Sequence, residues 1–124
     1  MIAVDTSTLI AYLAGERGRD VEALDSALAH NQARLPPVVV TEMLSAPNAP
    51  EHLVRLLAAM PILAIGDGYW ECAGRLRGRI LAHGLKAPLA DALISQSCLD
   101  HDLPLLTRDR DFKHFAKHGD LTLA

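Results

Sequence analysis

The sequence predicts an α/β fold in which helices cover both faces of a central parallel sheet. Short apolar runs typical of buried strands alternate with segments of helical periodicity along the whole chain. Acidic residues also directly follow several of these runs, as is common where parallel strands end beside a ligand site. Parallel strands need crossover helices, so we expect three layers, with about four to five strands in the middle.

The first half of the chain predicts two strands and four helices. "MIAV" is a short buried strand, and "STLIAYLAGE" continues it as a helix. A second helix is expected over about Arg19 to Asn31, after a break at Gly15 and Gly18. "LPPVVVTEML" predicts an extended entry, a β-branched strand and then a helix from about Thr41, and "EHLVRLLAAM" predicts the fourth helix.

The second half continues the alternation. "PILAIG" predicts a strand, and residues 67–83 predict a longer helix. Pro88 suits the first turn of the next helix, which should end at about Asp100. "LPLLT" is a predicted strand, "RDRDFKHFAKH" a short helix or loop, and "LTL" a closing strand.

The length and composition indicate one domain with a partner. A chain of 124 residues suits a single domain, residues 1–124, with its own core. Half of the residues are hydrophobic and only 4% are aromatic, so the core is mainly aliphatic. This is more apolar surface than a small lone domain needs, and we expect the surplus to form a homodimer interface or cover a protein partner.

Charge and cysteine usage indicate the class and the compartment. The net charge of −3 does not suit a general nucleic-acid binder, unless the acids cluster around cations. Cys72 and Cys98 are not spaced as a metal or redox pair, so we expect reduced thiols. The start of the chain shows neither an export signal nor a membrane span, and we expect a cytoplasmic protein.

Four acids stand apart from the others. Asp5 follows "IAV", Glu42 follows "VVVT" and Asp109 follows "LLTR", so all three are expected at the carboxyl edge of the sheet. Asp91 lies in the first turn of a helix that has no wide polar face and is therefore expected to be buried. Each acid alone has a structural explanation, namely a helix cap, a first-turn acid or an exposed turn.

Together, the four carboxylates point to a cation site. Two carboxylates 4 Å apart repel by about 4 kcal/mol at an effective dielectric of 20, so a cluster of them needs positive charge. Oxygen ligands suit hard divalent ions, Mg²⁺ in particular, which can activate a bound water and so indicate phosphate chemistry. Thr6, Ser7 and Thr107 lie next to these acids and could orient a carboxylate or a water. Asp111 competes with Asp109 for the fourth position.

Three segments together resemble a known family. The opening "MIAVDTSTLIAYL", the central "VVVTEML" and above all "PLADALISQSCLDHDLPLLTRDRDF" resemble the PIN-domain ribonucleases, specifically the VapC toxins of prokaryotic toxin–antitoxin pairs. The resemblance spans essentially the whole chain.

The resemblance implies a Mg²⁺- or Mn²⁺-dependent endoribonuclease. The catalytic acids would be Asp5, Glu42, Asp91 and Asp109, of which Asp5, Asp91 and Asp109 would hold the metal. We also expect Arg108 and Arg110, on either side of Asp109, to contact the RNA substrate. The resemblance also implies a homodimer that is neutralised by a VapB-like antitoxin, whose tail covers the site. The pair would contact DNA only through the antitoxin.

Two other readings compete with this one. Phosphoacceptor receiver domains have a similar length and alternation, and Asp67 after "PILAIG" resembles an acceptor, but Asp5 lacks the adjacent acid of that site. A PIN-like scaffold that binds without cutting is the second alternative. The four filled acidic positions favour the enzyme.

Overall fold

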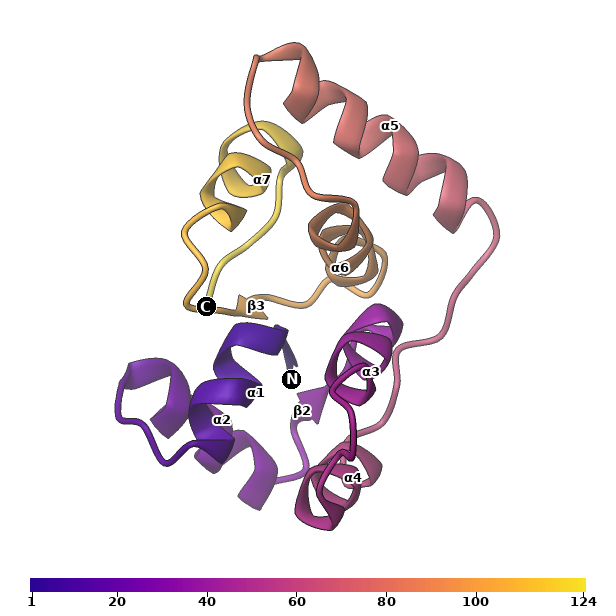
Figure 1. Ribbon diagram of the computed structural model, residues 1–124. Helices are drawn as coiled ribbons and strands as arrows, with labels where there is room; N and C mark the ends of the chain where they lie inside the picture. The colour runs from indigo at the N-terminus through magenta and orange to yellow at the C-terminus, as the bar shows by residue number, and fades with distance from the viewer.

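The computed structural model describes residues 1–124 as three short strands and seven helices (Figure 1). In chain order these are β1 Ile2–Val4, α1 Thr6–Leu13, α2 Arg19–Ala29, β2 Ala33–Arg34, α3 Pro37–Leu44, α4 Glu51–Ala58, α5 Tyr69–Ala82, α6 Leu89–Asp100, β3 Leu105–Leu106 and α7 Phe112–Gly119.

The strands form a parallel sheet in the order β2-β1-β3, with β1 in the centre. One isolated parallel bridge adds Ile62 beside Leu35, and another adds Leu123 beside Leu105. We predicted four to five strands, but the sheet has three, with one isolated bridging pair at each edge. "PILAIG" and "LTL" run alongside the sheet but do not form the strands we predicted.

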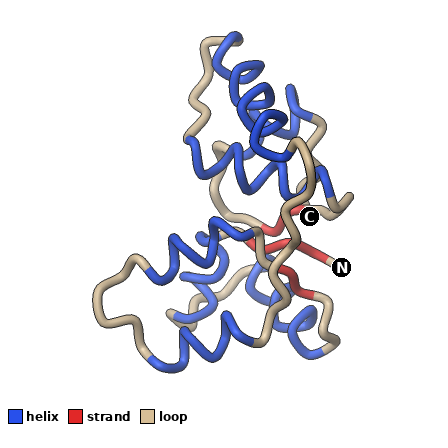
Figure 2. Tube along the Cα trace, turned by 90° about the vertical axis from the view of Figure 1, so that its right-hand side faces the viewer, coloured by secondary structure: helices blue, strands red, loops and turns tan.

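Helices lie on both sides of the sheet, which confirms the predicted α/β class. In Figure 1, α5, α6 and α7 gather on one side of the strands and α1 to α4 on the other, and the turned view in Figure 2 agrees. One cluster of 23 buried hydrophobic residues forms the core. It is mainly aliphatic, and the fully buried Phe112 and Phe115 of α7 are its aromatic members.

The "PVVV" segment is helical, so our prediction of a strand there was wrong. Helix α3 begins at Pro37, with Pro36 in extended conformation before it, and proline is well suited to the first helical position. Valine has a modest helix propensity, but Val39 and Met43 lie one turn apart and are both buried. Burial of this face outweighs the β preference. Thr41 consequently lies inside the helix and does not cap it.

Helix α6 is central to the packing, as its pattern predicted. Its buried residues extend around the helix, and α5, α3 and α7 all pack against it. The hydroxyl of Tyr69 in α5 donates a 2.7 Å hydrogen bond to the carbonyl of Leu93, which fixes α5 to α6. Both cysteines are free thiols. None of the helices is long and apolar enough to cross a membrane.

Candidate active site

Asp5 lies at the carboxyl end of the central strand and is held in one orientation. The residue is only 4% exposed and caps the N-terminus of α1. Its Oδ2 accepts hydrogen bonds from the Ser7 amide at 3.3 Å, the Ser7 hydroxyl at 2.7 Å and the Thr107 hydroxyl at 2.8 Å. All three donors act on this one oxygen, and the other oxygen, Oδ1, is left for another partner.

The two hydroxyls also fix the backbone that follows β3. Ser7 Oγ accepts from the amide of Arg108 at 3.1 Å, and Thr107 Oγ1 accepts from the amide of Asp109 at 3.0 Å. A hydroxyl has one proton, and both of these protons go to Asp5. The hydroxyls therefore link the start of α1 to residues 107–109.

Glu42 reaches the same region from the last turns of α3. The hydroxyl of Thr6 donates to its Oε1 at 2.8 Å, and the glutamate is exposed. Because "VVV" is helical, Glu42 does not follow a strand as we expected. Its helix brings the side chain towards the sheet edge, where Thr6 at the start of α1 contacts it.

Asp91 carries a buried carboxylate oxygen that has no partner. The residue lies in the first turn of α6, and its Oδ2 is buried without a hydrogen bond. Burial raises the pKa of Asp91 to about 7, and the charges of four acids add to the effect, in the order Asp109, Asp5, Glu42 and Asp111. The structure thus places all the predicted acids within electrostatic range of one carboxyl group.

A second buried oxygen without a partner lies nearby on the same helix. Ser95 follows Asp91 by one helical turn, is fully buried, and its Oγ makes no hydrogen bond. Buried polar atoms without partners are rare in folded proteins and call for an explanation. A cation or an ordered water at this face of α6 would satisfy them.

Asp109 and Asp111 occupy the loop that leads into α7. The Oδ1 of Asp109 accepts from the Asp111 amide at 2.9 Å, and the Asp109 side chain is exposed. Asp111 is half-buried at the N-cap of α7, where its side chain makes no capping bond. Asp109 contributes more than Asp111 to the raised pKa of Asp91, which favours Asp109 as the nearer charge.

The donor set suits a hard divalent cation. Every candidate ligand is a carboxylate oxygen, and Asp91 Oδ2 is buried among like charges with no partner. As the side chains stand, no three acidic, histidine or cysteine groups are placed so that they could hold one ion. The residues have the oxygen ligands that such an ion prefers. Because the carboxylates repel one another in its absence, their side chains must rotate inwards to share it.

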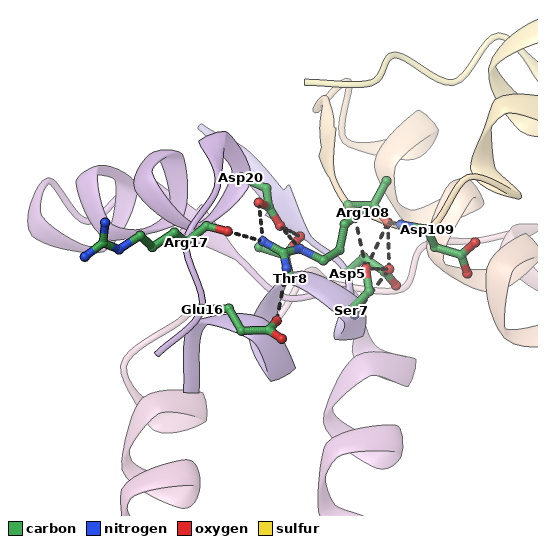
Figure 3. Close-up of polar contacts among 9 residues, drawn as sticks. Asp5, Ser7, Thr8, Glu16, Arg17, Asp20, Arg108 and Asp109 are labelled. Atoms are coloured by element: carbon green, nitrogen blue, oxygen red, sulfur yellow. Dashed lines mark hydrogen bonds and ion pairs between the residues drawn. The ribbon is translucent and has the colours of Figure 1, made fainter. Parts of the chain in front are cut away.

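An ion-pair group beside these acids was not predicted from the sequence. The Arg108 guanidinium donates to both oxygens of Asp20, at 2.7 and 2.8 Å, and to Glu16 at 3.0 Å (Figure 3). We expected Arg108 and Arg110 to contact RNA. Both residues are exposed, but the side chain of Arg108 forms ion pairs within the chain and that of Arg110 forms none. Gly15 and Gly18 predicted a turn between the first two helices, but no sequence pattern indicated that Arg108 would contact this turn.

The chain belongs to the PIN domain family. The family model for the PIN domain matches residues 2–118, nearly the whole chain. This match favours the PIN reading over a receiver domain, and Asp67 is an exposed residue that follows no strand. A comparison with curated protein sequences finds no match.

Three solved structures share the fold. The chain is similar to one in the crystal structure of VapBC2 from Rickettsia felis bound to a promoter DNA fragment, with 19% identity, a TM-score of 0.78 and coverage of 100% of this chain and 98% of that one. A toxin–antitoxin complex from Klebsiella pneumoniae gives 24% identity, a TM-score of 0.69 and coverage of 98% and 96%. FitAcB from Neisseria gonorrhoeae gives 21% identity and a TM-score of 0.70, with coverage of 99% of this chain and 96% of that one.

Proposed function

We propose that this PIN-domain protein is a divalent-metal-dependent endoribonuclease and the toxin of a VapBC-type toxin–antitoxin pair. The observation that carries the proposal is the buried, unpartnered Oδ2 of Asp91 among Asp109, Asp5 and Glu42. A carboxylate in this position is stabilised by a cation and strongly disfavoured without one. The family match and the fold shared with toxin–antitoxin chains support the class.

Asp5, Asp91 and Asp109 would hold Mg²⁺ or Mn²⁺, with Glu42 as a further catalytic acid and Asp109 in the fourth acidic position. When bound, the ion supplies Lewis acidity that activates water and neutralises charge at a phosphodiester. Asp5 presents Oδ1 because Ser7 and Thr107 hold Oδ2. Asp91 has a pKa of about 7 in the absence of metal, so it must lose its proton for the ion to bind near neutral pH.

The RNA would approach along the loop after β3. Asp109 lines a surface hollow together with Thr107, Arg108, Arg110 and Lys113, among others. Arg110 and Lys113 are exposed cations that can contact phosphate, and Thr107 lies between this hollow and Asp5. We assign the RNA contact to Arg110, with Lys113 beside it.

Two protein partners fit the surface. The acidic cluster would attract a basic residue from the tail of a VapB-like antitoxin, which would block the site by replacing the cation's charge. A separate apolar hollow is lined by Pro37, Val38, Thr41, Ile65, Tyr69, Trp70 and Leu93. Trp70 is 61% exposed at its rim, and Ile65 44%. We propose that this hollow is the homodimer interface. We also propose that the protein acts in the cytoplasm, where its RNA substrate is found.

The test is cleavage of RNA by the antitoxin-free protein. A mixture of tRNA and structured RNA is incubated with Mg²⁺ or Mn²⁺, and the products are separated on a gel, with EDTA and Asp91→Asn as controls. We expect cuts that require metal and that both controls lack. If the protein binds RNA or an antitoxin but shows neither cleavage nor metal binding, the non-catalytic scaffold is the correct reading.

A further inference from the structure

Arg108 joins two loops that are distant in the sequence. Four of its five guanidinium N–H donors are used: two on Asp20, one on Glu16 and one on the carbonyl of Arg17 at 3.1 Å (Figure 3). The paired contact of Nε and Nη2 with both oxygens of one carboxylate is the strong, directional form of the ion pair. It connects the loop after β3 to the loop between α1 and α2.

The Asp20 side of this contact is built to receive the guanidinium. Asp20 Oδ2 also accepts from the hydroxyl of Thr8 at 3.0 Å, and Thr8 is fully buried. Gly18 has a φ of 151°, and a Cβ at this position would lie 2.7 Å from Asp20 Oδ1 and 2.8 Å from Arg108 Nη2. The absence of a side chain at Gly18 lets the guanidinium lie against the loop. The hydrogen bond from Arg108 is the main reason that the pKa of Asp20 is lowered to about 2.

The backbone of Arg108 lies between the residues that serve the acids. Its amide donates to Ser7 Oγ, which in turn donates to Asp5. Thr107 before it donates to Asp5, and Asp109 after it supplies the largest charge acting on Asp91. A side chain anchored to Asp20 therefore fixes a backbone segment whose two neighbours both face the site.

We propose that Arg108 is a positioning residue, whose ion pair with Asp20 holds the loop after β3 so that Thr107 and Asp109 keep their places around the cation site. This inference rests on the proposed function, and it replaces the expected RNA contact for this arginine. Asp20 and Glu16 together neutralise the guanidinium, so an RNA phosphate would have to displace carboxylates that already bind it.

Asp20→Asn and Arg108→Ala separate positioning from RNA contact. Asp20→Asn breaks the ion pair but leaves Arg108 its charge. If Arg108 positions the loop, both variants and the double variant weaken Mn²⁺ binding in calorimetry by a similar factor, about 10-fold, as is typical when a group that orients a metal ligand is lost. Arg55→Ala on the exposed face of α4 is the matched control and leaves Mn²⁺ affinity unchanged.

RNA binding in EDTA is measured with a 2′-O-methyl oligonucleotide that cannot be cut. The inference predicts that Arg108→Ala leaves the salt dependence of binding unchanged. An RNA contact would instead lower the slope of log affinity against log salt by about 0.7 in Arg108→Ala, and it would make Asp20→Asn bind more tightly. That pair of results would overturn the inference while leaving the nuclease proposal intact.

Hydrogen exchange provides a readout that needs neither metal nor activity. The Asp109 amide donates to Thr107 Oγ1, so loosening the loop should speed its exchange at least about 10-fold in Asp20→Asn, with Arg55→Ala unchanged. Unchanged exchange would overturn the positioning role, whatever the activity. Faster exchange in Asp20→Asn, together with a wild type that neither binds metal nor cuts RNA, would support the anchor and reject the proposed function. Circular dichroism confirms that each variant folds, and Arg108→Gln, which also lacks the charge, replaces Arg108→Ala if the latter does not.

Discussion

The hydroxyl of Thr107 donates a 2.8 Å hydrogen bond to Asp5 across a separation of 102 residues. It joins the residue after β1 to the residue after β3, two strands that are neighbours in the sheet. The orientation of the most buried acid is therefore set by a residue near the other end of the chain. The candidate site exists only when the sheet is formed.

Thr107→Val tests this link, because valine keeps the shape and removes the hydroxyl. Asp5 loses one of three donors and Asp109 loses the acceptor for its amide. We predict about 10-fold weaker Mn²⁺ binding and a free energy of unfolding lower by about 1 to 2 kcal/mol. Calorimetry and denaturant unfolding measure the two effects. Thr122→Val, at an exposed position, should match the wild type. Unchanged Mn²⁺ affinity in Thr107→Val would show that Ser7 alone orients Asp5.

Asp91→Asn should stabilise the metal-free protein at pH 8. The pKa of Asp91 is about 7 in the folded state against an ordinary value of 3.8, so between these pH values the folded state keeps a proton that the unfolded state has lost. The wild type therefore loses stability as the pH rises from about 4 to 7, and asparagine carries no charge to lose. We predict a higher Tm for Asp91→Asn in EDTA at pH 8 and a gain that shrinks towards pH 4.

Asp67→Asn is the control for this pH dependence, since Asp67 is exposed on a loop before α5. Its Tm should follow that of the wild type at every pH. A Tm for Asp91→Asn below that of the wild type at pH 8 would mean that the carboxylate has a stabilising partner within the protein. The buried oxygen would then not need a cation.

Asp109 and Asp111 should differ in their effect on Asp91. Asp109 is the largest charge contribution to the raised pKa of Asp91, and Asp111 the smallest. In metal-free protein, Asp109→Asn should lower the pKa of Asp91 more than Asp111→Asn does, because it removes the nearer like charge. Carboxyl carbon shifts followed by NMR across pH 4 to 9 would measure both. A larger effect of Asp111→Asn would make Asp111 the fourth acid.

Trp70→Glu should disrupt self-association without unfolding the chain. Trp70 is 61% exposed beside an apolar hollow, so the substitution costs little in the monomer and places a charge in the proposed interface. We predict a dimer for the wild type and a monomer for Trp70→Glu by light scattering, at similar Tm. Val54→Glu on α4 replaces another exposed apolar residue, 47% exposed, and should remain dimeric. A dimeric Trp70→Glu would place the interface elsewhere.

The fold class could be predicted because short strand-like runs recur between helical segments along the whole chain. The "VVV" segment misled the prediction, since β-branched residues favour strands locally, whereas Pro36 and Pro37 start a helix and burial of Val39 maintains it. The strand in this region is β2, Ala33–Arg34, only two residues long, and a periodicity cannot be recognised in two residues.

Asp91 could be proposed as a site residue because it lies in an apolar helix, and Asp5 and Asp109 because they follow strand-like runs. Glu42 was proposed from a strand that the structure shows to be a helix. The contact between Arg108 and Asp20 was not identifiable, because nothing in a single sequence indicates which of fifteen acids an arginine will meet after folding. Glycine at position 18 marked a turn, and only the structure shows that the missing side chain makes room for a guanidinium.

The central claim is that the Asp91 carboxylate binds a divalent cation that it shares with Asp5 and Asp109. Mn²⁺ titration by calorimetry at pH 8 tests this claim most directly. The wild type, Asp5→Asn, Asp91→Asn, Asp109→Asn and the exposed control Asp67→Asn are compared in the absence of RNA. We predict saturable binding to the wild type and to Asp67→Asn, and binding at least about 10-fold weaker in each of the other three. Equal Mn²⁺ affinity in the wild type and Asp91→Asn would contradict the account.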